Sequence, residues 1–236
     1  MIEKMNAALD FLRDKYGIPA GTIIAGKDYY QLRLENGDTV NLLAHRVERR
    51  FVELKKIIDG GTLEDVSTFR FAHFRADGKL EKILANELDL AAFLSGSRVI
   101  RVYAVSGGEN NCNVIFRLEN GMSGCVECGA NLPVGAEILD RHEIIARRGV
   151  ASDRAVDTQV PQSSIYEWTE NGKRTFTDVD TELFGLPDEG IWTVRAAYAV
   201  LSNPALAAEW NKAAADILVQ SRAALESART GKPVNF

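Results

Sequence analysis

Residues 82–96 read KILANELDLAAFLSG, and they form the most informative stretch of the chain. Apolar residues recur there at helical spacing and Gly96 ends the run, so the pattern predicts an amphipathic helix. On that helix Lys82, Asn86 and Asp89 are four and three residues apart, which places them on one polar face. A solvated helix face is one interpretation of this pattern, and a ligand-binding face is the other.

Strand patterns lie on both sides of this helix. Residues 66–74 alternate between apolar and polar before it, and the block from residue 99 to 177 follows it. Within that block we expect six strands, at residues 99–105, 112–118, 124–130, 142–147, 164–169 and 174–177. Asn-Gly pairs at 120–121 and 171–172 supply tight turns between them.

Helical patterns occupy the two ends of the chain. They cover residues 2–16, 47–58, 191–201 and 206–225, and a hairpin is predicted at residues 29–43. This order predicts an α+β fold, with a largely antiparallel sheet covered by helices on one face. Several strands, including residues 114–116, are apolar on both alternating sets. We therefore expect the uncovered face of the sheet to pair with a second copy of the chain.

The composition is that of an ordinary globular protein. Of the 236 residues 46% are hydrophobic and 26% are charged, and the net charge is −5. A mildly acidic surface argues against a nucleic-acid groove, which needs clustered Lys and Arg. There is no signal-peptide pattern, no apolar run long enough to span a bilayer, and only three cysteines. We therefore expect a cytoplasmic protein that binds neither nucleic acid nor a membrane.

The usual motifs for cofactors and metals are missing from the sequence. There is no G-x-G-x-x-G or Walker loop and no G-x-S-x-G nucleophile motif. Cys125 and Cys128 form a lone C-x-x-C in a predicted strand, where odd spacing directs the two sulfurs to opposite faces. We interpret them as plain strand residues, with a metal or redox role as the alternative. The three histidines, His45, His73 and His142, are dispersed along the sequence. Only His142 has a carboxylate close to it in sequence, that of Glu143. We expect no cofactor and no metal.

Residues 86–96 resemble the opening helix of the C-terminal domain in the Gfo/Idh/MocA oxidoreductases, the family of glucose–fructose oxidoreductase and inositol dehydrogenase. That helix typically reads His-Asp-x-Asp-hydrophobic, followed by an aromatic-Leu pair and Gly. Three further segments are similar to family motifs and occur in the family's order: residues 45–61, 116–121 and 225–234. The resemblance covers about residues 40–236.

The resemblance implies an open mixed sheet, largely antiparallel, with helices on one face and oligomers formed through the other. It divides the chain into residues 1–40, a short N-terminal helix and hairpin strand, and residues 41–236, the family's C-terminal α+β domain. The departures concern catalysis. We expect no Rossmann domain, because only about 40 residues precede the match, and the family's Glu-Lys-Pro segment does not occur. The family's catalytic aspartate and histidine fall on Lys82 and Asn86. Asparagine cannot take up a proton, and lysine could act as a base only if burial lowered its pKa by several units. The catalytic residues are therefore unknown.

Two functions are compatible with these residues. The first is a non-catalytic, oligomeric binding or scaffolding subunit, pairing with itself or with a full-length sugar oxidoreductase and holding a sugar-like ligand. The alternative is an NAD-independent enzyme that acts on a sugar or sugar acid through Lys82, Glu87 or Asp89. In either case the candidate site consists of Lys82, Asn86, Glu87 and Asp89, with His73 and Arg75 at the end of the preceding strand. Lys82 and Arg75 would favour an acidic or phosphorylated sugar.

Overall fold

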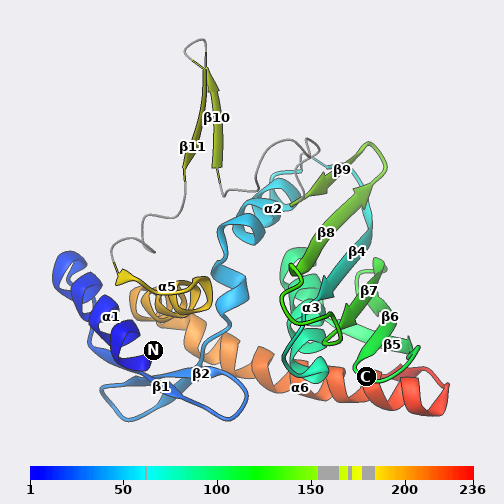
Figure 1. Ribbon diagram of the computed structural model, residues 1–236, viewed down its shortest axis with the longest axis horizontal. Coiled ribbons are helices and arrows are strands. Elements are labelled where there is room, and N and C mark those ends of the chain that lie inside the picture. Colours follow the sequence, from blue (N-terminus) through cyan, green and yellow to red (C-terminus); the bar gives the residue numbers. More distant parts are fainter. Residues whose placement is uncertain (62, 154–164, 170–171, 177–183) are drawn as a thin grey trace. The chain divides into compact units, whose positions relative to one another are not determined.

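The computed structural model describes residues 1–61, 63–153, 165–169, 172–176 and 184–236 (Figure 1). It divides into two compact units. The first contains Met1–Arg50 and Asp157–Ala214, and the second contains Phe51–Val156 and Ala215–Phe236. The predicted boundary between residues 40 and 41 falls inside the first unit.

The first unit combines helices with a small antiparallel sheet. Its elements are α1 (Ile2–Tyr16), β1 (Gly21–Ala25), β2 (Tyr30–Leu34), β3 (Thr39–Asn41), the 3-10 helix η1 (Ala44–Val47), β10 (Ile165–Thr169), β11 (Gly172–Phe176), α5 (Asp188–Ser202) and the first part of α6 (Ala205–Thr230). The sheet order is β1-β2-β3, and β10 pairs with β11. Gly37 has a φ of 88°, the conformation that the Asn-Gly turn between β2 and β3 requires. The predicted hairpin is therefore present, and β1 adds a strand to it. Of the turn predicted at 171–172, Asn171 lies outside the described residues.

The second unit is built on a seven-stranded sheet of order β12-β5-β6-β7-β4-β8-β9. Its strands are β4 (Val66–Phe74), β5 (Val99–Val105), β6 (Asn111–Leu118), β7 (Ser123–Gly129), β8 (Leu139–Ala146), β9 (Gly149–Ser152) and β12 (Val234–Asn235). The β4–β7 pair is parallel and the other neighbours are antiparallel. The sheet is therefore mixed and mostly antiparallel, which confirms the predicted α+β class.

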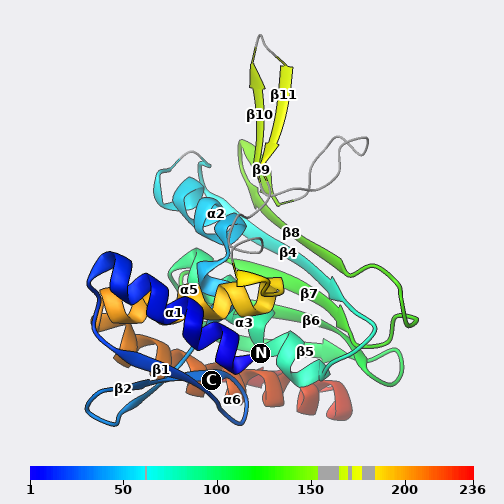
Figure 2. The same ribbon diagram turned by 60° about the vertical axis from the view of Figure 1, so that its left-hand side comes forward.

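Helices cover one face of this sheet and leave apolar side chains exposed on the other. Residues of α2 (Arg49–Asp59), α3 (Leu80–Ser95) and the end of α6 join the inward residues of the strands in one core (Figure 2). Phe69, Phe71 and Phe116 are among its fully buried members. On the opposite face β6 alternates strictly, and Ile115 is 60% exposed.

Close backbone packing in this sheet depends on one glycine. Gly124 of β7 pairs with Phe69 of β4 on one side and with Phe116 of β6 on the other. A Cβ at this position would lie 2.6 Å from the carbonyl oxygen of Phe69 and would collide with the ring of Phe116. The Phe116 ring therefore occupies the space that a side chain at residue 124 would need.

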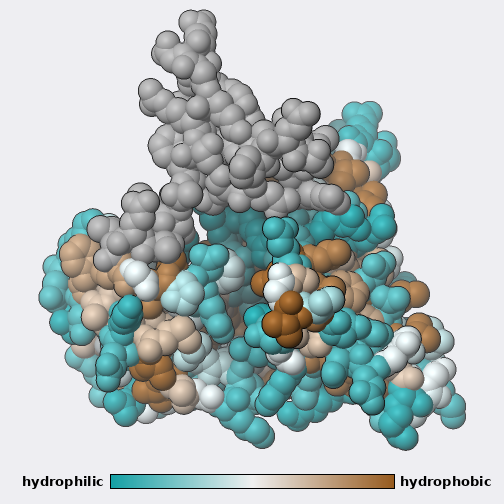
Figure 3. All heavy atoms as spheres, viewed as in Figure 1, coloured by the Kyte–Doolittle hydropathy of each residue, from teal (hydrophilic) through white to brown (hydrophobic). Residues whose placement is uncertain are grey.

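The described surface is mainly hydrophilic on the face seen in Figure 3, with hydrophobic residues scattered among polar ones. Among the described residues, no helix combines the length and the apolar character needed to cross a bilayer.

Candidate functional site

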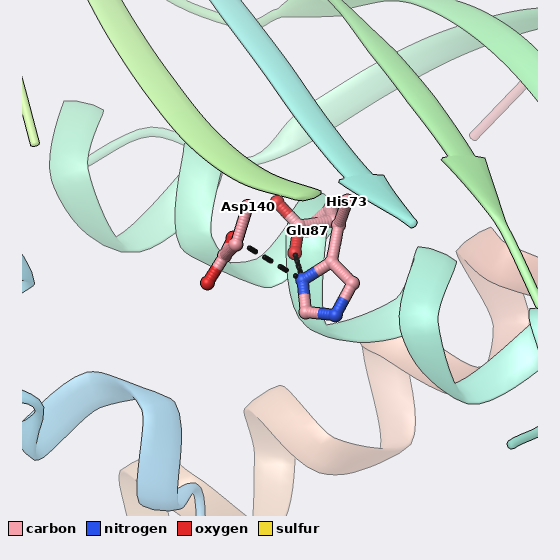
Figure 4. A group of neighbouring side chains, drawn as sticks. All are labelled: His73, Glu87 and Asp140. Carbon is pink, nitrogen blue, oxygen red and sulfur yellow. Dashed lines mark ion pairs between the residues drawn. The ribbon is translucent and has the colours of Figure 1, made fainter. Parts of the chain in front are cut away.

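A buried carboxylate in the second unit lies between two histidines. Glu87 Oε1 is 3.1 Å from His73 Nδ1, and Glu87 Oε2 is 2.9 Å from His142 Nε2. A second carboxylate, Asp140, places its Oδ1 3.3 Å from His73 Nδ1 and 3.7 Å from His142 Nε2. Figure 4 shows His73, Glu87 and Asp140 directed toward one another. We call Glu87, His73, Asp140 and His142 the Glu87 cluster.

Strand pairing brings these residues together from three elements. In the antiparallel β4–β8 pair, His73 is opposite Asp140 and Phe71 is opposite His142. Residues two apart on a strand share a face, so His73, Asp140 and His142 are all on the side that α3 covers. Glu87 reaches them from the middle of α3. The cluster is therefore held by regular elements and not by loops.

His142 is the most firmly held member of the cluster. Its ring is fully buried, and its Nδ1 lies 2.6 Å from Asp153 Oδ2, just beyond β9. The backbone N–H of His142 donates to Asp153 Oδ1 at 2.8 Å. The rings of Phe51 and Phe71 meet the imidazole edge-on at centroid distances of 4.7 and 4.8 Å. Packing and hydrogen bonds thus fix the orientation of this ring toward Glu87.

The charges of the cluster stabilise one another. Burial alone would lower the pKa of His73, but the carboxylates of Asp140 and Glu87 outweigh it and raise that pKa to about 9. Burial opposes the charge of His142 in the same way, but Glu87 and Asp153 raise its pKa to about 10. Glu87 would be neutralised by burial alone, whereas His142 and His73 lower its pKa to about 2. Around neutral pH Glu87 is therefore a carboxylate between two imidazolium groups.

Sequence analysis named six candidate site residues, and the structure brings two of them into contact, His73 and Glu87. Arg75 is paired with the exposed Asp77 at 2.9 Å. Asn86 is half-buried, and its Oδ1 is a buried atom without a hydrogen-bond partner among the described residues.

The predicted polar face of α3 differs from the observed one. Lys82, in the first turn, is exposed, whereas Asp89 is only 2% exposed. The helical spacing is as predicted, but the face passes from solvent into the protein interior within two turns. It is therefore not a solvated face along its length.

Three residues of the candidate site and its surroundings were missed by sequence analysis: Asp140, His142 and Asp153. The expectation that the histidines lack carboxylate partners is corrected here for His73 and His142, because strand pairing joins residues about 70 positions apart. The available signal was the spacing of Asp140 and His142, which places both on one face of a strand. The third histidine, His45, is buried in η1 of the first unit.

One cysteine lies beside this cluster, because Cys128 of β7 is opposite His73 in the parallel β4–β7 pair. Cys128 is buried and Cys125 is half-buried on β7, consistent with the predicted opposite faces. The sulfur of Cys128 lies 3.5 Å from that of Cys112, its partner across the β6–β7 pair. Neighbouring Cys112 and burial raise the pKa of Cys128. The close thiol pair is thus Cys112–Cys128 and not the C-x-x-C motif.

Comparison with known proteins gives a similarity of fold. No protein-family model matches the sequence, and no curated protein matches it. Solved structures do match, each over 82% of this chain and 63% of its own length. They include a probable dehydrogenase from Thermotoga maritima (18% identity, TM-score 0.60), myo-inositol 2-dehydrogenase from Lactobacillus plantarum (14%, 0.59) and scyllo-inositol dehydrogenase from Lactobacillus casei with bound NAD(H) and scyllo-inositol (17%, 0.54).

These matches confirm the predicted resemblance at the level of the fold. The chain has the α+β fold found in inositol and sugar dehydrogenases, and the share of their length that it spans is consistent with their C-terminal domain. The 236 residues contain no glycine-rich loop of the kind that holds the pyrophosphate of NAD, so they do not by themselves fit that cofactor.

Proposed function

We propose that this chain is a non-catalytic binding subunit that holds a sugar-like ligand and assembles with itself or with a full-length sugar oxidoreductase. The observation that carries the proposal is the Glu87 cluster. It sets charged hydrogen-bonding groups on rigid elements, and His73 and Asp140 remain 21% and 18% exposed at its edge. Such a group of donors and acceptors suits a molecule rich in hydroxyl groups.

The chemistry of the ligand follows from the hydrogen-bonding groups that the site offers. His73 Nε2 is a buried atom that has no hydrogen-bond partner among the described residues. A hydroxyl group of a bound polyol would satisfy it, while Asp140 would accept from a second hydroxyl. The solved structure from Lactobacillus casei holds scyllo-inositol, a ligand of this chemical class.

Binding is better supported than catalysis. Glu87 is held ionised by two histidines, which makes it a poor general base near neutral pH. Asn86, at the position of the family's histidine, cannot accept a proton at all. The alternative is an NAD-independent enzyme that uses Lys82, Glu87 or Asp89. Glu87 does not suit the role of general base in such an enzyme.

Assembly and location complete the proposal. Exposed apolar residues on the open face of the sheet, Tyr103, Val105 and Ile115, support a homodimer or a higher homo-oligomer formed through that face. We also propose a cytoplasmic location, because three cysteines in 236 residues are too few for a disulfide framework.

Thermal-shift screening in the presence of EDTA tests the binding function. We expect inositols, sugar acids or sugar phosphates to raise the Tm of the wild-type chain, and His73→Ala to abolish the shift. Lys82→Ala with Asn86→Ala tests the other predicted contacts in the same assay. Lys56→Ala, an exposed change on α2, is the control and should respond as the wild type does.

Two results would contradict the proposal. One is an equal ligand shift in the wild type and in His73→Ala. The other is turnover of a sugar or sugar acid by the purified chain alone, followed by loss of substrate, which would favour the enzyme alternative.

A further inference from the structure

We propose that His73, Glu87 and Asp140 form a binding site for one divalent first-row transition-metal ion. The three residues offer an imidazole Nδ1 and two carboxylate oxygens that all lie within 4.8 Å of one another. They come from β4, α3 and β8, and Figure 4 shows their side chains converging. Metal binding does not depend on the sugar-like ligand proposed above.

The two separations that His73 makes fit ligands that share one ion. His73 Nδ1 is 3.1 Å from Glu87 Oε1 and 3.3 Å from Asp140 Oδ1. Nitrogen and oxygen ligands at about 2.0–2.2 Å from zinc, with angles near 90–110°, are about 3.0–3.5 Å apart. Small side-chain rotations would therefore be enough to coordinate an ion.

A chain of hydrogen bonds orients the central ligand. His142 Nε2 contacts Glu87 Oε2 at 2.9 Å, and Asp153 in turn holds His142 Nδ1 at 2.6 Å. This contact secures one oxygen of Glu87 and leaves Oε1 directed toward His73 and Asp140. Outer contacts of this kind are typical of metal sites, where they fix the orientation of the ligating carboxylate.

The charge of the site also favours a cation. Glu87, Asp140 and Asp153 bring three carboxylates to a site with two imidazoles. Because the carboxylates outnumber the imidazoles, the group can offset the charge of a divalent cation.

The ligand set indicates which metals suit the site. One imidazole and two carboxylates form a mixed N/O set that matches Zn²⁺, Co²⁺, Mn²⁺ and Fe²⁺, whereas thiolate-seeking ions are disfavoured. Three protein ligands leave further coordination positions open to water or to neighbouring hydroxyl groups of a ligand.

Metal titration of the full chain tests this inference without any sugar present. After EDTA treatment and desalting, Zn²⁺ is titrated by calorimetry and Co²⁺ by visible absorption. We expect one equivalent of either ion to bind, with cobalt bands that lack a sulfur-to-cobalt charge-transfer band. His73→Ala and Asp140→Asn should each weaken binding by at least about 100-fold, and Asp153→Asn by about 10–100-fold.

Matched variants and a folding check keep the result interpretable. Glu143→Gln removes a carboxylate three residues from Asp140 on the same strand, and Cys125→Ser removes a thiol of the C-x-x-C motif; both should bind as the wild type does. Circular dichroism confirms that the nearly isosteric Asp140→Asn variant is folded. The site is refuted if the wild type binds no metal, if Asp140→Asn and His73→Ala bind normally, or if bound cobalt shows a thiolate charge-transfer band. Because the sugar screen contains EDTA, failure of either proposal leaves the other intact.

Discussion

Glu87 is a buried carboxylate whose charge is balanced by two histidines, so its replacement should destabilise the second unit. Glu87→Gln keeps the shape of the side chain but leaves the imidazolium groups of His73 and His142 without their shared partner. Removal of one member of a buried charge group typically costs about 3–5 kcal/mol. We expect a loss of about 3 kcal/mol in the free energy of unfolding, measured by urea denaturation with EDTA present. Glu81→Gln, on the same helix, removes an exposed ion pair with Arg222 and should change stability by less than about 1 kcal/mol. Equal effects of the two changes would show that the cluster does not stabilise the fold.

Regular elements were predictable where the signal was local. The helix over residues 2–16 and the strand over 66–74 coincide with α1 and β4, because each follows a period that the neighbouring residues define. The short strand β9 and the two-residue β12 carry too few residues for a pattern. The pairing of the strands could not be predicted either, because neither β4 nor β7 carries a sequence pattern that identifies the other as its parallel partner. Glu87 could be named as a candidate from its place on the predicted helix, and His73 from its place at the end of the preceding strand. Asp140 and His142 could not be named, because only the β4–β8 pairing brings them to the site.

Gly124 gives a test of packing at the level of the strands. We expect Gly124→Ala to lower the free energy of unfolding by about 3 kcal/mol, because the added Cβ meets the Phe116 ring and the Phe69 carbonyl oxygen. Gly121→Ala is the matched change in the adjoining turn. There φ is 90° and no atom lies within 4 Å of the added Cβ, so only backbone strain of about 1 kcal/mol is expected. Chemical denaturation measures both, and a smaller loss for Gly124→Ala than for Gly121→Ala would contradict the packing argument.

Assembly through the open face of the sheet is the prediction for the whole molecule. We expect light scattering to give about 52 kDa at tens of micromolar protein, twice the 26.0 kDa of one chain. Ile115→Lys places a charge amid that face and should yield monomers. Val219→Lys, an equally exposed change on α6, should leave the mass unchanged. A wild-type mass of about 26 kDa would exclude this dimer.

The return of the chain to the second unit sets an order of events during synthesis. Residues 157–214 separate the two segments of that unit. At about 5–20 residues per second a ribosome needs about 3–12 s to make them. Throughout this delay the nascent sheet lacks Ser227, whose hydroxyl accepts the Ala104 N–H, and β12, which pairs with β5. An unfinished sheet with a bare apolar surface and an unpaired edge is a substrate for chaperones. The yield of folded protein in cells should therefore depend strongly on chaperone supply, even if the finished protein is stable at equilibrium.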